Sequence, residues 1–245
     1  MSGAVREAGR AAARRRPVLL LLVPLLVERA AIAGATGDAT VVSTGMGRRR
    51  ALAAAAKGRH TPADAVGVAG LCGGLTRDLR PGDVVVATSL MTDDGDQAAA
   101  ISLSSGPLIA ALHARGLGRV HAGLVVSSPR VVGRSERARL ATRGAIAVDM
   151  ESAWLSGAAA GRPFAVLRVV IDTPATRLWR PLAAARGLLA ARRALRQAVP
   201  ALADWARAAG PGDIAVEGLS VTTDTMHVTR PPTAAGAPAG RDGVG

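Results

Sequence analysis

The segment from Ala145 to Asp172 restricts the fold more than any other part of this sequence. It begins with a short apolar run that ends at Asp149 and continues with small residues at helical spacing from Ser152 to Gly161. A second apolar run, Phe164 to Ile171, then stops at Asp172. This pattern predicts a strand, a helix and a strand. Because ligands bind beyond the carboxyl ends of strands in open α/β sheets, acids at both strand ends indicate a site there.

The acids at these strand ends have two interpretations, and both stay open at this point. Two carboxylates supplied by neighbouring strands can perform different tasks on one substrate, because each one has its own surroundings. Alternatively, Asp149 and Glu151 only cap the helix that begins at Ser152, since acids suit the first turn of a helix. Capping accounts for one acid, but it leaves the strand that ends in Asp172 unexplained.

The length and composition of the chain indicate one large α/β domain. The chain has 245 residues, of which 49% are hydrophobic, so it can bury a substantial core. We expect a mobile basic arm over residues 1–16, the folded domain over residues 17–209, and a disordered tail over residues 210–245. The single cysteine, Cys72, cannot form an internal disulfide, which suits a reducing, cytoplasmic location.

The formal net charge is +13, and almost all of the positive charge is arginine, because Lys57 is the only lysine. Such a charge can attract nucleic acid or an anionic membrane surface. We do not expect nucleic acid as a partner, because no aromatic residues that would stack on bases alternate with the arginines. We expect a solvated basic face with peripheral attraction to an anionic membrane.

The first long apolar run, Pro17 to Val27, is too short to cross a membrane as a helix. It is either the first buried strand of a parallel sheet or the core of a signal peptide. The signal peptide would use Arg14 to Arg16 as its charged region and Ala31 to Ala33 as its cleavage site. Glu28 comes directly after this run, and from position alone it could be an exposed acid at the start of a helix.

A glycine-rich turn containing Gly45 and Gly47 lies between a predicted strand, Val41 to Ser43, and an alanine-rich helix, Ala51 to Ala56. Glycines at such a turn let backbone N–H groups approach an anion or a ribose at the start of the helix. Arg48 follows the turn and could neutralise a phosphate, although an ordinary exposed arginine fits the pattern equally well.

The remaining apolar runs predict further strands and helices. We expect a strand that ends in a glycine-rich turn over residues 65–75, a tight turn and a strand over residues 79–87, and a strand over residues 120–127. The expected helices cover residues 108–115, 135–142 and 182–209, the last of these continuous or split at Pro200. Leucines seven residues apart, at positions 188, 195 and 202, would pack this last helix on the sheet.

An acidic triplet, Asp93, Asp94 and Asp96, is the main feature that could suggest a metal site. Its spacing and the missing final glutamate do not fit an EF-hand calcium loop. We therefore expect no metal, and we interpret Met91 to Gly106 as a loop at the mouth of the site.

Two of these segments resemble a known family. AVDMES at residues 147–152 and GRPFAVLRVVID at residues 161–172 resemble the signature of the nucleoside phosphorylase and nucleosidase superfamily, and most closely that of the hopanoid-associated phosphorylases. The resemblance covers about Leu19 to Leu195. It implies an α/β three-layer sandwich around a mixed, mostly parallel sheet, and a homo-oligomer. It also makes residues 17–27 the first strand of the sheet, which we prefer to the signal peptide.

The resemblance implies roles for particular residues in breaking an N-ribosyl bond, which passes through an oxocarbenium-like state. Asp172 would protonate N7 of the leaving adenine, and Glu151 would bind the ribose hydroxyls and stabilise positive charge. Met150 would pack on the sugar, and Asp149 would orient the turn. Glu28 falls where the nucleosidases place the acid that activates water.

The base and phosphate contacts implied by the resemblance lie on three loops. Gly74 belongs to the glycine-rich end of the strand that begins at residue 65, where Leu71 stands in place of the serine that the family often has. Val131 replaces a phenylalanine that stacks on the base. Gly45, Gly47 and Arg48 would hold a phosphate if one is used, so inorganic phosphate is a co-substrate option and no other cofactor is expected.

The implied reaction is the release of adenine from an adenine nucleoside, with adenosylhopane as the favoured substrate and a lipid as its 5′ group. Water and phosphate both stay open as the attacking group. Methylthioadenosine or S-adenosylhomocysteine is the alternative substrate. The alternative of another class is a basic, exported or membrane-surface binding protein without catalytic activity.

Overall fold

The computed structural model describes residues 18–93, 101–175 and 181–209 of the chain. The strands are β1 (Leu19–Val23), β2 (Thr40–Ser43), β3 (Ala65–Gly74), β4 (Val84–Thr92), β5 (Ile101–Ser102), β6 (Val120–Ser127), β7 (Ala145–Asp149) and β8 (Phe164–Asp172). The helices are α2 (Leu26–Ile32), α3 (Arg48–Gly58), α4 (Gly106–Ala114), α5 (Arg134–Thr142), α6 (Ser152–Leu155), the 3-10 helix η1 (Ser156–Ala158), α7 (Pro181–Ala198) and α8 (Pro200–Ala208).

The described strands form one mixed sheet in the order β2-β1-β3-β7-β6-β4-β5, and β8 pairs with both β3 and β4. Five of the strand pairs are parallel, and the pairs β3–β7, β4–β5 and β4–β8 are antiparallel. Strands β3, β8, β4, β6 and β7 each pair with two others of this set, so they close into a ring. The mixed, mostly parallel sheet of the prediction is confirmed, but it is partly closed rather than open.

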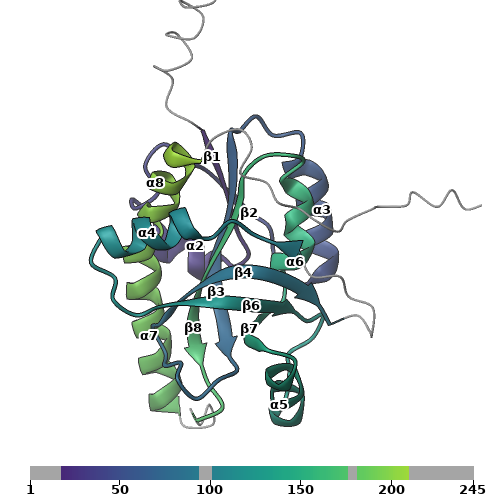
Figure 1. Ribbon diagram of the computed structural model, residues 1–245, viewed down its shortest axis with the longest axis vertical. Coiled ribbons are helices and arrows are strands. Elements are labelled where there is room, and N and C mark those ends of the chain that lie inside the picture. Colours follow the sequence, from purple (N-terminus) through teal and green to yellow (C-terminus); the bar gives the residue numbers. More distant parts are fainter. Residues whose placement is uncertain (1–17, 94–100, 176–180, 210–245) are drawn as a thin grey trace, which may run out of the picture.

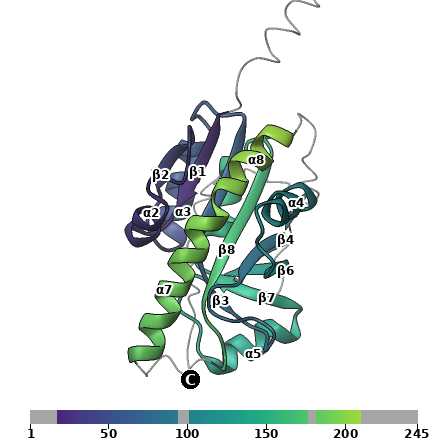
Figure 2. The same cartoon turned by 90° about the vertical axis from the view of Figure 1, so that its left-hand side faces the viewer.

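Helices cover both faces of the sheet, as the predicted three-layer arrangement requires. Helices α2, α4, α7 and α8 lie on one face, and α3 and α6 lie on the other (Figure 1). Each face has its own buried apolar cluster, one with Leu195 and Leu202 and one with Ala51 and Leu155. Figure 2 shows α7 and α8 running one after the other along the first face, beside β8. The leucines at positions 195 and 202 therefore pack on the sheet, as predicted.

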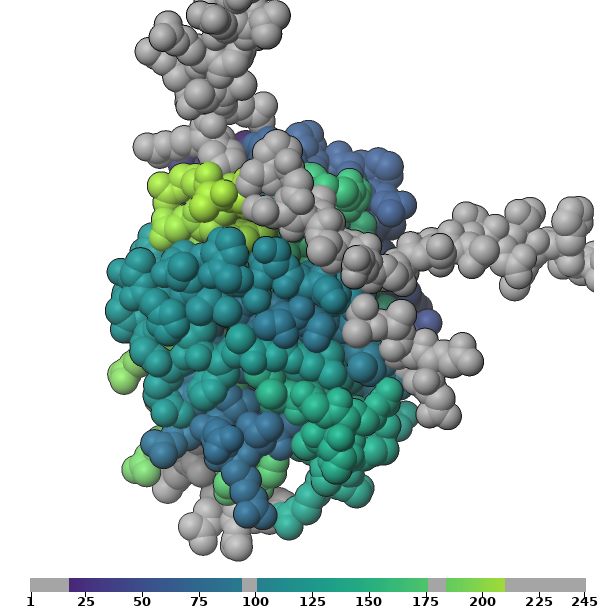
Figure 3. Space-filling view, in the orientation of Figure 1, coloured from purple at the N-terminus to yellow at the C-terminus, as the bar shows by residue number. Residues whose placement is uncertain are grey.

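One face of the molecule is built largely from the middle of the chain. In the space-filling view, the residues from β4 to α5 cover most of the middle of the surface shown (Figure 3). Helix α5 is packed there on a third, smaller apolar cluster that includes Leu75, Val132 and Leu140. This cluster joins the end of β3 to the loop before α5, and both segments border the candidate site.

The first strand is central to the fold. Every residue of β1 is buried, and β1 pairs in parallel with β2 on one side and β3 on the other. The strand prediction for this part of the 17–27 run is confirmed. Cleavage after Ala33 would remove β1 from the sheet, together with Glu28.

Some predicted elements differ from the structure. The helix expected from Ser152 to Gly161 is only one turn of α-helix, α6, followed by η1. The C-terminal segment forms two helices that meet at Val199 and Pro200, which is the split alternative of the prediction, because proline starts a helix more readily than it continues one. The loop expected from Met91 to Gly106 contains the end of β4 and all of β5.

Several predictions fall outside the described residues and stay predictions. These are the basic arm over residues 1–16, the tail over residues 210–245, and the positions of Asp94 and Asp96. Within the described ranges, no helix is both long enough and apolar enough to cross a membrane.

Candidate active site

Glu151 follows β7 and connects two distant parts of the fold. Its carboxylate accepts a hydrogen bond from the backbone N–H of Gly47, with 3.0 Å between N and Oε1. Gly47 is the residue before α3 and has a φ of 91°, a conformation that favours glycine. The predicted glycine turn and the predicted Glu151 therefore lie at one site.

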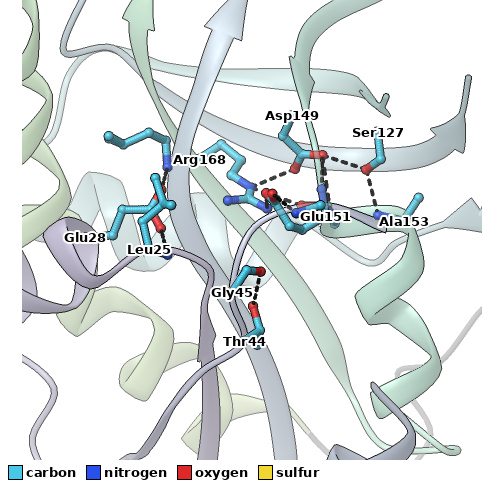
Figure 4. Close-up of polar contacts among 12 residues, drawn as sticks. Leu25, Glu28, Thr44, Gly45, Ser127, Asp149, Glu151, Ala153 and Arg168 are labelled. Atoms are coloured by element: carbon cyan, nitrogen blue, oxygen red, sulfur yellow. Dashed lines mark hydrogen bonds and ion pairs between the residues drawn. The ribbon is translucent and has the colours of Figure 1, made fainter. Parts of the chain in front are cut away.

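Asp149 orients the turn between β7 and α6. Its Oδ1 accepts hydrogen bonds from the hydroxyl of Ser127 at 2.6 Å and from the backbone N–H groups of Glu151 and Ser152 at 3.2 Å. The Ser127 hydroxyl also accepts from the backbone N–H of Ala153 at 2.9 Å. The capping interpretation is therefore right for Asp149, whereas the side chain of Glu151 does not cap the helix (Figure 4).

A buried arginine on β8, Arg168, lies beside both acids (Figure 4). Its Nε is 2.8 Å from Asp149 Oδ2 and donates to the Ser152 hydroxyl at 3.0 Å, and its Nη2 is 3.6 Å from Glu151 Oε2. The side chain is completely buried, and its Nη1 and Nη2 have no hydrogen-bond partner among the described residues. Buried donors are normally hydrogen-bonded, so these two nitrogens are exceptions.

Glu28 reaches the same region from α2 and is 2% exposed. Its two oxygens accept hydrogen bonds from the backbone N–H groups of Leu25 and Leu71, both at 2.7 Å. Glu28 is therefore not an exposed acid at the start of a helix. The residue for which the resemblance implied a catalytic role lies in the interior, next to the end of β3.

The close approach of Glu28 and Arg168 depends on Gly70 in β3. A Cβ atom on Gly70 would lie 2.4 Å from Arg168 Nη1 and 2.8 Å from Glu28 Oε1. Real Cβ atoms do not come this close to other atoms, so both side chains use the space that a missing side chain leaves.

The buried charges at this site do not balance. Arg168 is one cation among three carboxylates, Glu28, Asp149 and Glu151, all of which are buried. Burial raises the pKa of Glu151 to about 7, although the charge of Arg168 opposes the shift. Burial also raises the pKa of Glu28 against the same opposing charge. Raised carboxyl pKa values of this kind are typical of groups that gain and lose protons near neutral pH.

Asp172 ends β8, four residues after Arg168 and beyond an irregularity in the pairing of β8 with β3. Its Oδ2 is 2.7 Å from Nη2 of Arg137, which comes from α5. The prediction that Asp149 and Asp172 end neighbouring strands is wrong, because β3 lies between β7 and β8. Gly73 of β3 pairs with both Val148 and Asp172, so the two strand ends still lie on either side of the same residue.

Cys72 lies between the two groups of charged residues. Burial raises the pKa of its thiol far above the ordinary value, and the charges of Arg168, Asp149, Asp172 and Arg137 also act on it. The expectation that Cys72 is a small buried residue is therefore confirmed. Cys72 pairs with Val170 of β8, which stands between Arg168 and Asp172 in the chain, so the two ion pairs are adjacent along β8.

The other predicted residues take different positions around this region. Met150 is half-buried in the turn between Asp149 and Glu151. Gly74 presents its carbonyl to Arg137 Nη1 at 3.5 Å. Val131 is 79% exposed, and the next residue, Val132, is the one that packs in the core. The guanidinium of Arg48 lies 5.9 Å from the centre of the Trp154 ring.

The sequence interpretation gave no role to three residues that the structure places among these contacts: Ser127, Arg137 and Arg168. Arg168 carried a usable signal, because an arginine inside the apolar run FAVLRVVID must be buried with a partner. Ser127 and Arg137 carried none, since a serine at a strand end and an arginine on a polar helix are common. Among the described residues, no group of His, Cys, Asp and Glu could hold a metal ion.

Comparison with known proteins agrees with this architecture. Residues 27–208 match the Phosphorylase superfamily. The 5′-methylthioadenosine/S-adenosylhomocysteine nucleosidase of Helicobacter pylori has a similar structure, with a TM-score of 0.66, 18% identity, and coverage of 80% of this chain and 100% of that one. The nucleosidase of Neisseria meningitidis gives a TM-score of 0.64, 21% identity, and coverage of 79% and 100%. Futalosine hydrolase of Helicobacter pylori gives a TM-score of 0.67 and 17% identity, with coverage of 77% of this chain and 98% of that one.

No curated protein matches the chain by sequence. The fold is the α/β fold of the nucleoside phosphorylases and nucleosidases. Because the superfamily match covers more than half of the chain, the protein belongs to the Phosphorylase superfamily. It is therefore an enzyme of the nucleoside phosphorylase or N-glycosidase class, which excludes the alternative of a binding protein without catalytic activity.

Proposed function

We propose that the protein hydrolyses the N-glycosidic bond of an adenine nucleoside and releases adenine. One observation carries the proposal: Glu28, Arg168 and Glu151 are buried together beside the end of β3, and Asp172 ends the adjacent strand. N-ribosyl cleavage develops positive charge on the sugar and negative charge on the base. A site that places several carboxylates beside the sugar and a proton donor beside the base suits this separation of charge.

The sugar side of the reaction is assigned to Glu151. Its carboxylate, held by the N–H of Gly47, is suited to accept hydrogen bonds from ribose hydroxyls and to stabilise the cation. Met150 adds an adaptable apolar surface for the sugar. The pKa of Glu151 is raised to about 7. We therefore expect kcat/KM to rise with pH around pH 7, as Glu151 becomes ionised.

The attacking group is assigned as water, with Glu28 as the base. A carboxylate whose pKa is raised by burial is a stronger base than an exposed one, and Arg168 has buried donors that can orient the water oxygen. In the reaction the water oxygen bonds to C1′ and one water proton passes to Glu28. The C1′–N9 bond breaks with its electron pair going to the purine, and N7 takes the proton of Asp172. Solvent then returns the proton from Glu28 to Asp172.

Two observations favour water over phosphate. The backbone N–H groups of Gly47 and Leu71, which could bind an anion, already donate to Glu151 and Glu28. A phosphate would also bring further negative charge next to three buried carboxylates that have one arginine between them. Gly45, Gly47 and Arg48 therefore form a phosphate site only if these hydrogen bonds rearrange, and phosphorolysis is the second candidate.

The 5′ group is proposed from the sequence resemblance, which favours adenosylhopane and therefore ribosylhopane as the second product. Peripheral contact with a membrane would suit such a lipid substrate, and the formal net charge of +13 is consistent with it. A small nucleoside is the alternative, because the similar Helicobacter pylori and Neisseria meningitidis structures are nucleosidases of methylthioadenosine and S-adenosylhomocysteine. We also propose, from the same resemblance, that the protein forms a homo-oligomer.

The test is adenine release by the purified full chain, measured by chromatography with adenosylhopane in detergent micelles and with methylthioadenosine, each with and without inorganic phosphate. We expect release without phosphate and a higher kcat/KM for adenosylhopane. Strict dependence on phosphate, with a sugar 1-phosphate as product, would replace hydrolysis by phosphorolysis. No release of base from either nucleoside would overturn the proposed function.

A further inference from the structure

Arg137 makes contacts with three segments that border the base side of the candidate site. Its Nη2 is 2.7 Å from Asp172 Oδ2, its Nη1 is 3.5 Å from the Gly74 carbonyl oxygen, and its Nε is 3.4 Å from the Val132 carbonyl oxygen. These partners lie at the end of β8, at the end of β3 and in the loop before α5. One guanidinium therefore connects the proposed acid to both neighbouring segments.

The backbone leaves room for this side chain at a particular glycine. A Cβ atom on Gly73 would lie 3.0 Å from Arg137 Nη2 and 3.2 Å from its Cζ, so the guanidinium lies flat against the main chain of β3. The side chains of Arg137 and Asp172 are 14% and 6% exposed. An ion pair with so little exposure has a defined geometry, unlike the exposed pairs of the surface.

We propose that Arg137 is a positioning residue for Asp172, which fixes one carboxyl oxygen so that the other is directed at the purine base. The inference rests on the proposed function, in which Asp172 gives a proton to N7. When the proton leaves, Asp172 becomes a carboxylate again, and Arg137 is already in place to stabilise it. The loop with Val131 is tied to the same guanidinium through Val132, so the base-binding segment and the acid keep a common geometry.

The alternative is that Arg137 only joins α5 to the rest of the protein. The two roles differ in how substitutions combine. A residue that acts through Asp172 has little left to do once Asp172 is changed, whereas a purely structural residue lowers activity independently of Asp172. A double-mutant cycle of Arg137 and Asp172 therefore separates them.

The experiment compares four proteins: the wild type, Arg137→Met, Asp172→Asn and the double variant. We expect Arg137→Met to lower kcat by about 10²-fold, as a misplaced catalytic group does, with a much smaller change in KM. In the Asp172→Asn protein the same substitution should change kcat by less than about twofold. Arg137→Lys keeps the charge but loses the fork of donors, so it should recover part of the lost rate.

Arg139→Met is the matched control, because Arg139 lies on the same helix and joins Asp93 and Glu136 instead. It should leave kcat unchanged, and circular dichroism and urea unfolding of each variant will show which of them are folded. Losses from Arg137→Met and Asp172→Asn that multiply in the double variant would overturn the inference. An Arg137→Met protein with the kcat of the wild type would also overturn the inference. In either case, adenine release by the wild type would leave the proposed function intact.

A second readout does not need turnover. Binding of adenine, measured by calorimetry, should weaken about tenfold in Arg137→Met, because the Asp172 carboxyl is no longer held toward the base. If the wild type cleaves no nucleoside but binds adenine in this Arg137-dependent way, the proposed function fails and the positioning role stands. A wild-type protein that neither cleaves nucleosides nor binds adenine would overturn both.

Discussion

The backbone N–H of Gly47 donates to the carboxylate of Glu151 at 3.0 Å, joining residues that are 104 positions apart in the sequence. Through this bond the start of α3 contacts the turn that follows β7. The side chain of Arg48 extends the same contact by lying over the ring of Trp154 in α6. The position of the carboxylate proposed to bind ribose is therefore determined by two segments on one face of the sheet.

The first prediction concerns the proposed acid. Asp172→Asn keeps the size of the side chain but removes the proton that would pass to N7. General acid catalysis typically contributes about 10²–10⁴-fold, so the rate of adenine release should fall by that factor with folding intact. The measurement is kcat for adenine release, with far-ultraviolet circular dichroism to show folding. A folded Asp172→Asn enzyme of wild-type activity would remove Asp172 from the mechanism.

The second prediction uses the space at Gly70. Gly70→Ala places a Cβ against Arg168 and Glu28, which are buried and cannot move outward, so one of them must leave its position. We expect a loss of about 1–3 kcal/mol in the free energy of unfolding, as for other overpacked sites, together with a large fall in kcat/KM.

The matched control for Gly70→Ala is Gly67→Ala in the same strand, where the nearest atoms to a new Cβ are at 3.5 Å. This substitution should change stability and activity far less. Equal effects of the two substitutions would show that the space at Gly70 has no special role.

The third prediction concerns pH and stability. The pKa of Glu151 is raised from 4.5 to about 7 by burial, so between these values the folded protein keeps a proton that the unfolded chain has lost. The stability from this group is therefore fully present below pH 4.5 and declines as pH rises to about 7, by at most about 1.4 kcal/mol per pH unit. Glu151→Gln, which can still accept from Gly47, lacks this decline.

The comparison is urea unfolding of the wild type and Glu151→Gln at pH 5, 6, 7 and 8. The stability of the variant relative to the wild type should increase with pH up to about 7 and then remain constant. A difference that does not change with pH would mean that Glu151 titrates in the folded protein as it does in the unfolded chain.

The fourth prediction concerns the buried arginine. Arg168→Met leaves Asp149 and Glu151 without their cation, and removal of one partner from a buried ion pair typically costs about 3–5 kcal/mol. The loss should be smaller at pH 5 than at pH 8, because the carboxylates can then be protonated instead of paired. Urea unfolding at the two pH values measures both effects.

Arg207→Met is the surface control for Arg168→Met, because Arg207 pairs with Asp204 while 56% of its side chain is exposed. Exposed pairs contribute about 0–1 kcal/mol, so this variant should unfold close to the wild type at both pH values. An Arg168→Met protein as stable as Arg207→Met at pH 8 would contradict a structural role for the buried cluster.

Much of the fold could be predicted from residue patterns. Strands β3, β7 and β8 lie where continuous apolar runs predicted them, because a strand covered on both faces needs apolar side chains at every position. The acids Asp149 and Asp172 stand at the ends of two of these runs, so their place at the edge of a sheet was also predictable. Local signals were weaker for α6, where a run of small residues looked like a longer helix than the single turn that forms.

The partners of the charged residues could not be predicted in this way. The pairs Gly47–Glu151 and Arg137–Asp172 join segments 104 and 35 positions apart, and nothing in the local pattern specifies either one. Only the sheet, in which β8 pairs with both β3 and β4, brings Arg168 among Glu28, Asp149 and Glu151. Hydrophobic periodicity depends on neighbours along the chain, whereas the pairing and proton affinity of buried charges depend on distances that exist only after the strands have assembled.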